Sequence, residues 1–134
     1  MSNMTYKEFL TKVGINEDPD LTAVKQDGCA IKYVKEQTLE ICMAAVKQNG
    51  CAIQYVEEQT LAICIAAVKQ NGYAIEYVKE QTPEICMATV KQHGNVINRV
   101  EEQTPELCIA AVKQNSRAIV YVDKSIFNEE KENG

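Results

Sequence analysis

Six cysteines offer the most reactive chemistry in this 134-residue chain. Four of them occupy one position of a repeated segment: Cys42, Cys64, Cys86 and Cys108. A ladder of thiols could bind a metal or take part in redox chemistry. Because the chain has no C-x-x-C pair and His93 is its only histidine, we expect no metal site and no cofactor. We expect these four thiols to be buried, where their small size lets helices approach closely.

The other two cysteines, Cys29 and Cys51, lie at a different and variable position of the repeat, which also holds Tyr73, Asn95 and Arg117. We expect both thiols to be partly exposed, and the sequence leaves open whether they are reactive. The chain contains no nucleophile motif and no paired carboxylates in an apolar setting. We therefore expect a protein that is not an enzyme.

Each repeat also carries one lysine followed by one glutamine. The lysines are Lys25, Lys47, Lys69, Lys91 and Lys113, and the glutamines are Gln26, Gln48, Gln70, Gln92 and Gln114. A lysine near the C-terminus of a helix stabilises the negative end of the helix dipole; alternatively, the lysines form an edge that binds an acidic partner or phosphates. No aromatic interleaving or glycine-rich loop accompanies them, which counts against nucleic acid. We expect the glutamines to form amide ladders between the loops of neighbouring units.

A cluster of polar residues departs from the repeat pattern in the fourth unit: His93, Asn95, Asn98 and Arg99. A repeat protein could hold its specific contact at such departures, and neutral drift is the alternative. The candidate binding residues are this cluster together with Arg117 and the lysines Lys47, Lys69, Lys91 and Lys113.

A repeat of 22 residues positions all of these side chains. Successive copies open at Ala23, Ala45, Ala67, Thr89 and Ala111. A fixed period of this length is typical of a solenoid, in which each unit buries its apolar face against its neighbours.

Each unit predicts two short helices. The segment 82–84 combines a threonine N-cap, a proline at the first helical position and an acid in the first turn. Gly94 ends the run that follows and is a typical C-terminal stop signal. A shorter second helix, such as residues 74–81, precedes the next threonine. We therefore expect an all-α fold, namely a short α-solenoid of five 22-residue two-helix repeats with an N-terminal capping helix.

The first helix of each unit is apolar nearly all round. In the second copy, Met43 and Ala44 lie outside the apolar face, which is formed by Ile41, Cys42, Ala45 and Val46. A helix of this kind usually packs on more than one side, so we expect it to be the inner helix of the array.

A leucine-rich repeat is the alternative fold, because residues 41–51 formally fit its L-x-x-L-x-L-x-x-N-x-C pattern. However, alanine fills a bulky core position in every copy, and the next expected leucine is Gln54 or Glu76. Thr-Pro-Glu would also start a helix where that pattern has none. We favour helices over strands.

We expect residues 1–134 to form one repeat domain with distinct ends. Residues 5–14 open with a capping-box pattern and predict a helix whose apolar side covers the first repeat. The repeats occupy residues 19–124. Residues 125–134 predict a C-terminal cap, in which Ile126 and Phe127 seal the core, and a frayed tail.

The block VKQNGYAIEYV followed by TPEIC resembles a tandem-repeat domain of unknown function found in bacteria and in amoeba-infecting giant viruses. The resemblance extends from Leu21 to about Val122. It implies an array of short helices, and the family has no established activity to transfer.

The net charge of −5 disfavours binding to nucleic acid and to anionic membranes. No apolar stretch is long enough to span a bilayer, and six cysteines without a secretory signal are typical of a reducing, cytoplasmic compartment, either bacterial or of a host. We expect a protein-binding module or adaptor. A nucleic-acid-binding array that uses the lysine row, or a small acidic inhibitor or immunity-type partner, is the alternative.

Overall fold

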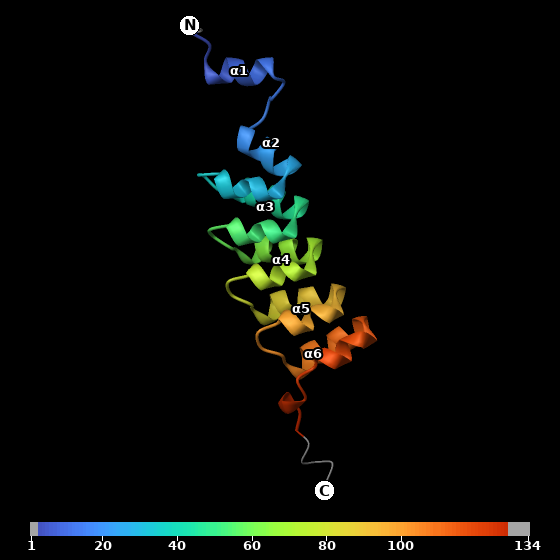
Figure 1. Cartoon of the computed structure of the whole chain (residues 1–134). Helices are drawn as coiled ribbons and strands as arrows, with labels where there is room; N and C mark the ends of the chain where they lie inside the picture. The colour runs from blue at the N-terminus through green and yellow to red at the C-terminus, as the bar shows by residue number, and fades with distance from the viewer. Residues whose placement is uncertain (1–2, 129–134) are drawn as a thin grey trace.

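The computed structural model describes residues 3–128 as a row of stacked helices (Figure 1). The α-helices are α1 (Tyr6–Lys12), α2 (Pro19–Gln26), α3 (Leu39–Gln48), α4 (Leu61–Gln70), α5 (Pro83–Gln92) and α6 (Pro105–Gln114). The 3-10 helices are η1 (Gly28–Tyr33), η2 (Gly50–Tyr55), η3 (Gly72–Tyr77), η4 (Gly94–Arg99), η5 (Ser116–Tyr121) and η6 (Lys124–Ile126). Residues 3–128 contain no strand, which excludes the leucine-rich alternative. The predicted short helical repeat solenoid is confirmed.

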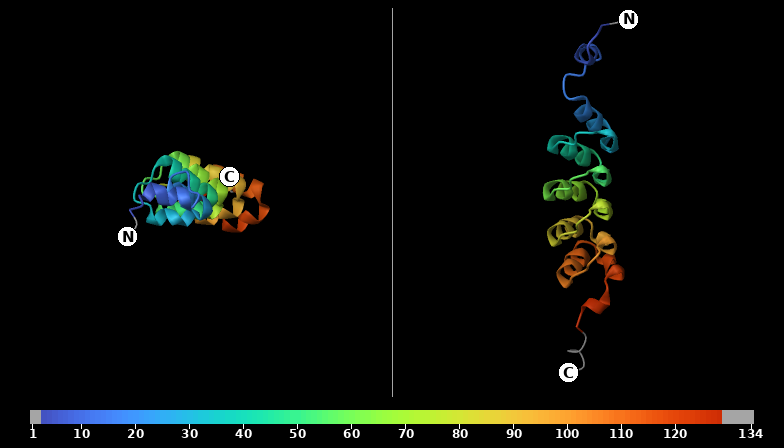
Figure 2. Two further views of the ribbon diagram at one scale, coloured as in Figure 1. Left: turned by 90° about the horizontal axis from the view of Figure 1, so that it is seen from above. Right: turned by 90° about the vertical axis from the view of Figure 1, so that its left-hand side faces the viewer.

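The array has two layers. The α-helices α3 to α6 stack along one side and the 3-10 helices along the other (Figure 2). Each of η1 to η4 packs against the α-helix before it and the α-helix after it, so successive units share one interior.

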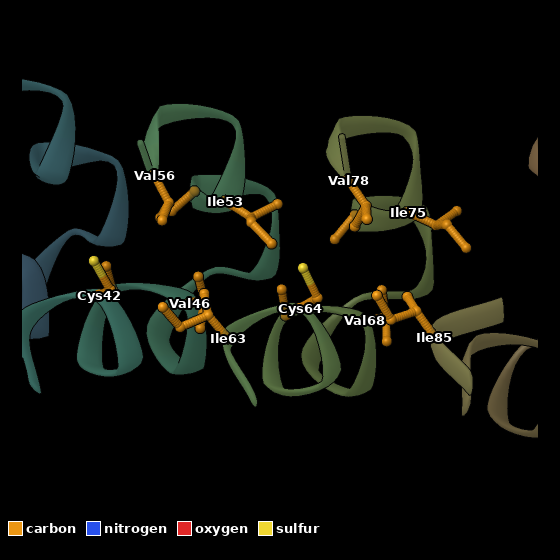
Figure 3. Packing of buried hydrophobic residues seen from close by; sticks show 14 of the residues in the cluster. Cys42, Val46, Ile53, Val56, Ile63, Cys64, Val68, Ile75, Val78 and Ile85 are labelled. Carbon is orange, nitrogen blue, oxygen red and sulfur yellow. The ribbon is translucent and has the colours of Figure 1, made fainter. Parts of the chain in front are cut away.

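The core lies between these layers. Ile53 and Ile75 point from the 3-10 helices toward Val46, Val68 and the neighbouring α-helices (Figure 3). The equivalent isoleucine is completely buried in four consecutive units: Ile31, Ile53, Ile75 and Ile97. The predicted burial of the four cysteines at one repeat position is confirmed. Each residue is only 3% exposed: Cys42, Cys64, Cys86 and Cys108.

The predicted helix starts are confirmed. The Thr82 hydroxyl accepts a hydrogen bond from the Ile85 backbone N–H at 3.3 Å, and Pro83 occupies the first helical position. Thr104 caps α6 in the same way through the Leu107 N–H. These caps satisfy donors that the first turn of a helix leaves free.

The second helix of each unit is a six-residue 3-10 helix rather than the longer helix expected over residues 74–81. Two glutamine side chains end it early. The Gln81 amide donates to the Ile75 carbonyl at 3.1 Å, and the Gln59 amide of the preceding unit donates to the Tyr77 carbonyl at 3.0 Å. These carbonyls are therefore satisfied without a further helical turn.

The glycine after each of α2 to α5 is not a left-handed stop residue, because the only residue with a positive φ in the described chain is Gly14, which follows α1 as the predicted stop. The glycines after α2 to α5 allow a close approach instead. A Cβ atom on Gly50 would lie 2.3 Å from the Ala67 carbonyl oxygen of the next α-helix. The Gly50 N–H donates to the Gln70 side chain at 2.5 Å, so the predicted amide link between units is present here.

The N-terminal helix is present, but its predicted packing is wrong. Thr5 and Glu8 form the expected capping box. No residue of α1 is buried, and Phe9 is 46% exposed, because the segment of residues 13–18 holds α1 away from α2 (Figure 1).

The predicted seal at the other end is also wrong. Ile119 occupies the position of the completely buried Ile97 but is 56% exposed. Phe127 remains largely exposed, because the three-residue η6 is too short to replace the ten-residue α-helix that covers Ile97. Of the predicted tail, residues 129–134 lie outside the described residues.

We predict that Gly50→Ala lowers the free energy of unfolding by about 3 kcal/mol, because the new methyl group separates two units and breaks the bond to Gln70. Urea denaturation measures the loss. Gly14→Ala is the control: its φ is +83° and no atom lies within 4 Å of the added Cβ. It should cost about 1–2 kcal/mol, from backbone strain alone. A loss for Gly50→Ala no larger than for Gly14→Ala would contradict the close approach.

Candidate binding surface

The structure separates the candidate residues into two regions. The lysines lie on the outer surface of the α-helix layer, in the last turn of each helix: Lys47, Lys69, Lys91 and Lys113. The polar departures of the fourth unit lie at the junction of α5 with η4, and Arg117 lies on η5. The lysine row and the polar cluster are therefore not one site.

The outer surface of α3 to α6 consists of three parallel bands, which together we call the α-face. An apolar band runs along the middle and is formed by Met43, Ala44, Ile65, Ala66, Met87, Ala88, Ile109 and Ala110. The lysine row borders it at the helix C-termini. The second residue of each helix borders it at the N-termini: Glu40, Ala62, Glu84 and Glu106.

The expected packing of the α-helices on more than one side is confirmed, because α3, for example, contacts α2, α4, η1 and η2, but the outermost side of the helices is uncovered within residues 3–128. Met43, Ile65 and Met87 are half-buried, and Ile109 is 53% exposed. The helices contact their neighbours sideways and the 3-10 helices beneath, but no layer of the described chain covers their outer side. The apolar residues outside the core-facing side therefore form a partly exposed band: seven of its eight residues are half-buried and also pack against the core, and Ile109 is exposed.

The α-face is hollowed between successive helices. A groove of about 680 Å³ lies along α3 and α4 and is lined by Met43, Leu61, Ile65 and neighbouring residues, with Lys47 and Lys69 at its edge. Grooves of about 500 Å³ between α2 and α3 and about 520 Å³ between α5 and α6 repeat the pattern.

Four lysines of the row are available for a partner. Lys25 forms an ion pair with Glu17 at 3.0 Å. None of the other four is part of an ion pair within residues 3–128, and all are exposed: Lys47, Lys69, Lys91 and Lys113. Each also lies near the negative end of its helix dipole, so the structural explanation of the row stands beside the functional one.

The polar cluster changes one junction of the array. Gly28, Gly50 and Gly94 each donate their N–H to a glutamine of the next α-helix, whereas Gly72 has no such bond to Gln92 in the described chain. The His93 side chain occupies this place instead: a Cβ atom on Gly72 would lie 2.7 Å from its Cδ2 atom.

His93 also lacks the capping function of the asparagine that it replaces. Asn71 accepts a hydrogen bond from the Tyr73 N–H at 3.0 Å, but His93 makes no capping bond to η4. The Oδ1 atom of Asn95 is buried without a hydrogen-bond partner. The junction between the third and fourth units is therefore the least satisfied in the array.

Arg99 bridges this junction on the 3-10 side. Its guanidinium group forms an ion pair with Glu76 and lies 5.7 Å from the centre of the Tyr73 ring. Asn98 is exposed, as is Arg117 on the next 3-10 helix. Two members of the cluster, His93 and Arg99, therefore contact the preceding unit of their own chain.

One set of functional side chains was missed by the sequence analysis. The glutamines of the loops clamp adjacent units together: Gln37, Gln59, Gln81 and Gln103. Gln59, for example, donates to the Tyr77 carbonyl and accepts from the Lys79 N–H at 2.9 Å. The signal was their strict 22-residue spacing in the Glu-Gln-Thr segment.

Burial lowers the reactivity of the four core thiols. Burial raises the pKa of the thiol in the whole core column: Cys42, Cys64, Cys86 and Cys108. Burial also raises the pKa of Cys51, which with Cys29 is half-buried as expected.

No group of three or more His, Cys, Asp or Glu side chains within residues 3–128 could hold a metal ion. No helix of that region has the length and apolar composition needed to cross a membrane.

The family model described as a domain of unknown function (DUF4116) matches the chain twice, over residues 21–61 and 39–82. The matches start in two consecutive α-helices, α2 and α3, as tandem units should. No curated protein and no solved structure matches the chain. Over residues 21–82, the chain is therefore similar to a domain of unknown function with a repeat-like arrangement.

We predict that His93→Asn raises the free energy of unfolding by about 1–2 kcal/mol, because it restores a cap and frees Gly72 to bond to Gln92. Thermal and urea denaturation measure the gain. The reverse change at the preceding junction, Asn71→His, should destabilise the array by a similar amount. A neutral or destabilising His93→Asn would contradict this view of the junction.

We also predict that Cys29 reacts first with iodoacetamide in the folded protein at neutral pH. The four core thiols should react at least about tenfold more slowly, because burial keeps them protonated and inaccessible. Mass spectrometry after a short pulse of reagent assigns the order. Labelling of Cys64 as fast as that of Cys29 would contradict the burial, and urea-unfolded protein provides the uniform reference.

Proposed function

We propose that the protein is a non-enzymatic interaction module that binds an acidic, apolar segment of another protein on its α-face. One observation carries this proposal: a partly exposed apolar band runs across four α-helices beside a row of lysines that form no ion pair within residues 3–128. The band supplies apolar area for burial, and the lysines supply charge complementarity to an acidic partner.

The α-face suits a protein segment better than a nucleic acid. Its floor is formed by aliphatic side chains and methionine, with no aromatic ring on which a base could stack. Acids line the edge opposite the lysines: Glu40, Glu84 and Glu106. These carboxylates would repel a phosphate backbone that follows the lysine row. A small acidic inhibitor is the weaker alternative, because an inhibitor of that kind would bind its target through negative groups, whereas the α-face carries a row of lysines.

We also propose that the protein acts in a cytoplasmic compartment. All six cysteines are free, which fits a reducing, cytoplasmic compartment of a bacterium or a host cell. The likeness to a tandem-repeat domain of bacteria and giant viruses, extended to about residue 122, fits the same setting.

Selection from a displayed random peptide library tests the proposal. We predict that the enriched peptides combine apolar and acidic residues and that Ile65→Glu weakens their binding by about tenfold or more, because it places a charge in the apolar band. Gln54→Glu, an exposed change on η2 with the same added charge, should leave binding unchanged.

A second variant distinguishes a loss of binding from a loss of folding. The double change Lys47→Glu and Lys69→Glu alters only exposed side chains and should also weaken binding, while the melting temperature stays near that of the unchanged protein. Peptides that are insensitive to all α-face variants would contradict the proposal. So would single-stranded RNA that binds more tightly than the peptides at physiological salt.

A further inference from the structure

The α-face is least acidic at its centre. Ala62 occupies the second position of α4, where the other helices carry an acid: Glu40, Glu84 and Glu106. Leu61 and Ile65 line the groove beside it, which at about 680 Å³ is larger than the equivalent grooves of about 500 and 520 Å³. The α-face therefore offers one enlarged apolar site, with Lys47 and Lys69 at its edge.

We propose that the occupant of the α-face is an amphipathic α-helix of a partner protein, which lies along the array and places its main apolar anchor in the groove beside Ala62. This inference rests on the proposed function and specifies the partner. The anchor is a large aliphatic or aromatic side chain, and acidic residues of the partner helix lie along the flank that faces the lysine row.

The lining of the groove favours a helix over an extended peptide. Its side chains are aliphatic or methionine, apart from two lysines, Gln70 and Glu84. The Gln70 oxygen already accepts from the Gly50 N–H. An extended segment would leave much of its backbone without hydrogen-bond partners against this floor, and no sheet edge exists within residues 3–128 to pair with it. A helix satisfies its own backbone.

The spacing of the array also fits a helix. Packed α-helices lie about 8–10 Å apart, and seven residues of an α-helix span about 10.5 Å. A helix that runs along the array therefore presents the same side to each successive groove about every seven residues. Anchors at this spacing would meet the grooves between α2 and α3 and between α3 and α4, and, two repeats further along, the groove between α5 and α6.

The charges at the two edges of the α-face determine which flank of the bound helix faces each edge. Acids on one flank meet Lys47, Lys69 and Lys91, while neutral or basic residues on the other flank meet Glu40 and Glu84. Because the two edges have opposite signs, a helix with acids on both flanks fits less well than one with acids on a single flank.

Three synthetic peptides of matched length test the inference by fluorescence anisotropy. The first is a helix with leucines every seventh residue and glutamates along one flank. The second has the same composition with leucines every fifth residue, which spreads them around the helix. The third is the first with a central proline, which breaks the helix. We predict that the first binds the full chain and that the other two bind at least about tenfold more weakly.

Two variants taken from the repeat itself locate the anchor. Ala62→Glu introduces the residue that other units already carry at this exposed position, so the fold should tolerate it. It should weaken binding of the first peptide by about tenfold, whereas Gln54→Glu, which adds the same charge on η2 and introduces the residue found at the equivalent Glu76, should not weaken it. A loss with Gln54→Glu equal to that with Ala62→Glu would overturn the anchor position.

The outcomes separate this inference from the proposed function. If library peptides depend on Ile65 but show no preference for a helix or for seven-residue spacing, the helix proposal is overturned and the interaction module stands. If no peptide binding depends on the α-face, both proposals fail. Equal binding of all three synthetic peptides, or tighter binding of the proline peptide, would overturn the helix proposal alone.

Discussion

The array depends on a contact that only glycine permits. At three junctions, the backbone of Gly28, Gly50 or Gly94 lies so close to the following α-helix that a Cβ atom would meet a carbonyl oxygen at 2.2–2.4 Å. The glycine N–H simultaneously bonds to a glutamine of that helix. This contact holds the 3-10 layer against the next α-helix, above a row of completely buried isoleucines. Each unit is thus stabilised by its neighbours rather than by a core of its own.

The same geometry leaves the outer side of the α-helices free. Since the interior is shared between each α-helix and the 3-10 helices beside it, the opposite side of each α-helix packs only in part against the core and is otherwise uncovered within residues 3–128. Selection for folding alone favours polar residues on such a surface. The apolar band from Met43 to Ile109 is therefore the feature that most needs a functional explanation, and the α-face rather than the polar cluster around His93 is the better candidate for a partner.

Much of the fold could be predicted from the sequence because its signals are local. The 22-residue period, the threonine caps and the buried isoleucines are all present in single units. Three features depend on contacts between units and could not be predicted. The 3-10 helix of residues 72–77 ends where the side chains of Gln59 and Gln81 donate hydrogen bonds to its last carbonyls. The outward side of α4 is apolar but uncovered. A helix that is covered on that side would show the same pattern of apolar residues, so the sequence could not distinguish the two. The replacement at His93 was noticed, but its contact with Gly72 in the preceding unit was not.

Native-state hydrogen exchange of the glycine amides tests the central contact most directly. If the glycine–glutamine bond couples the units, the Gly50 amide should exchange only through opening of the array, as should the neighbouring core amides. The Gly72 amide is equally buried but lacks this bond, so it should exchange markedly faster than the amide of Gly50. Equal protection of the two amides, or rapid exchange at Gly50, would contradict the coupling of the units through this contact.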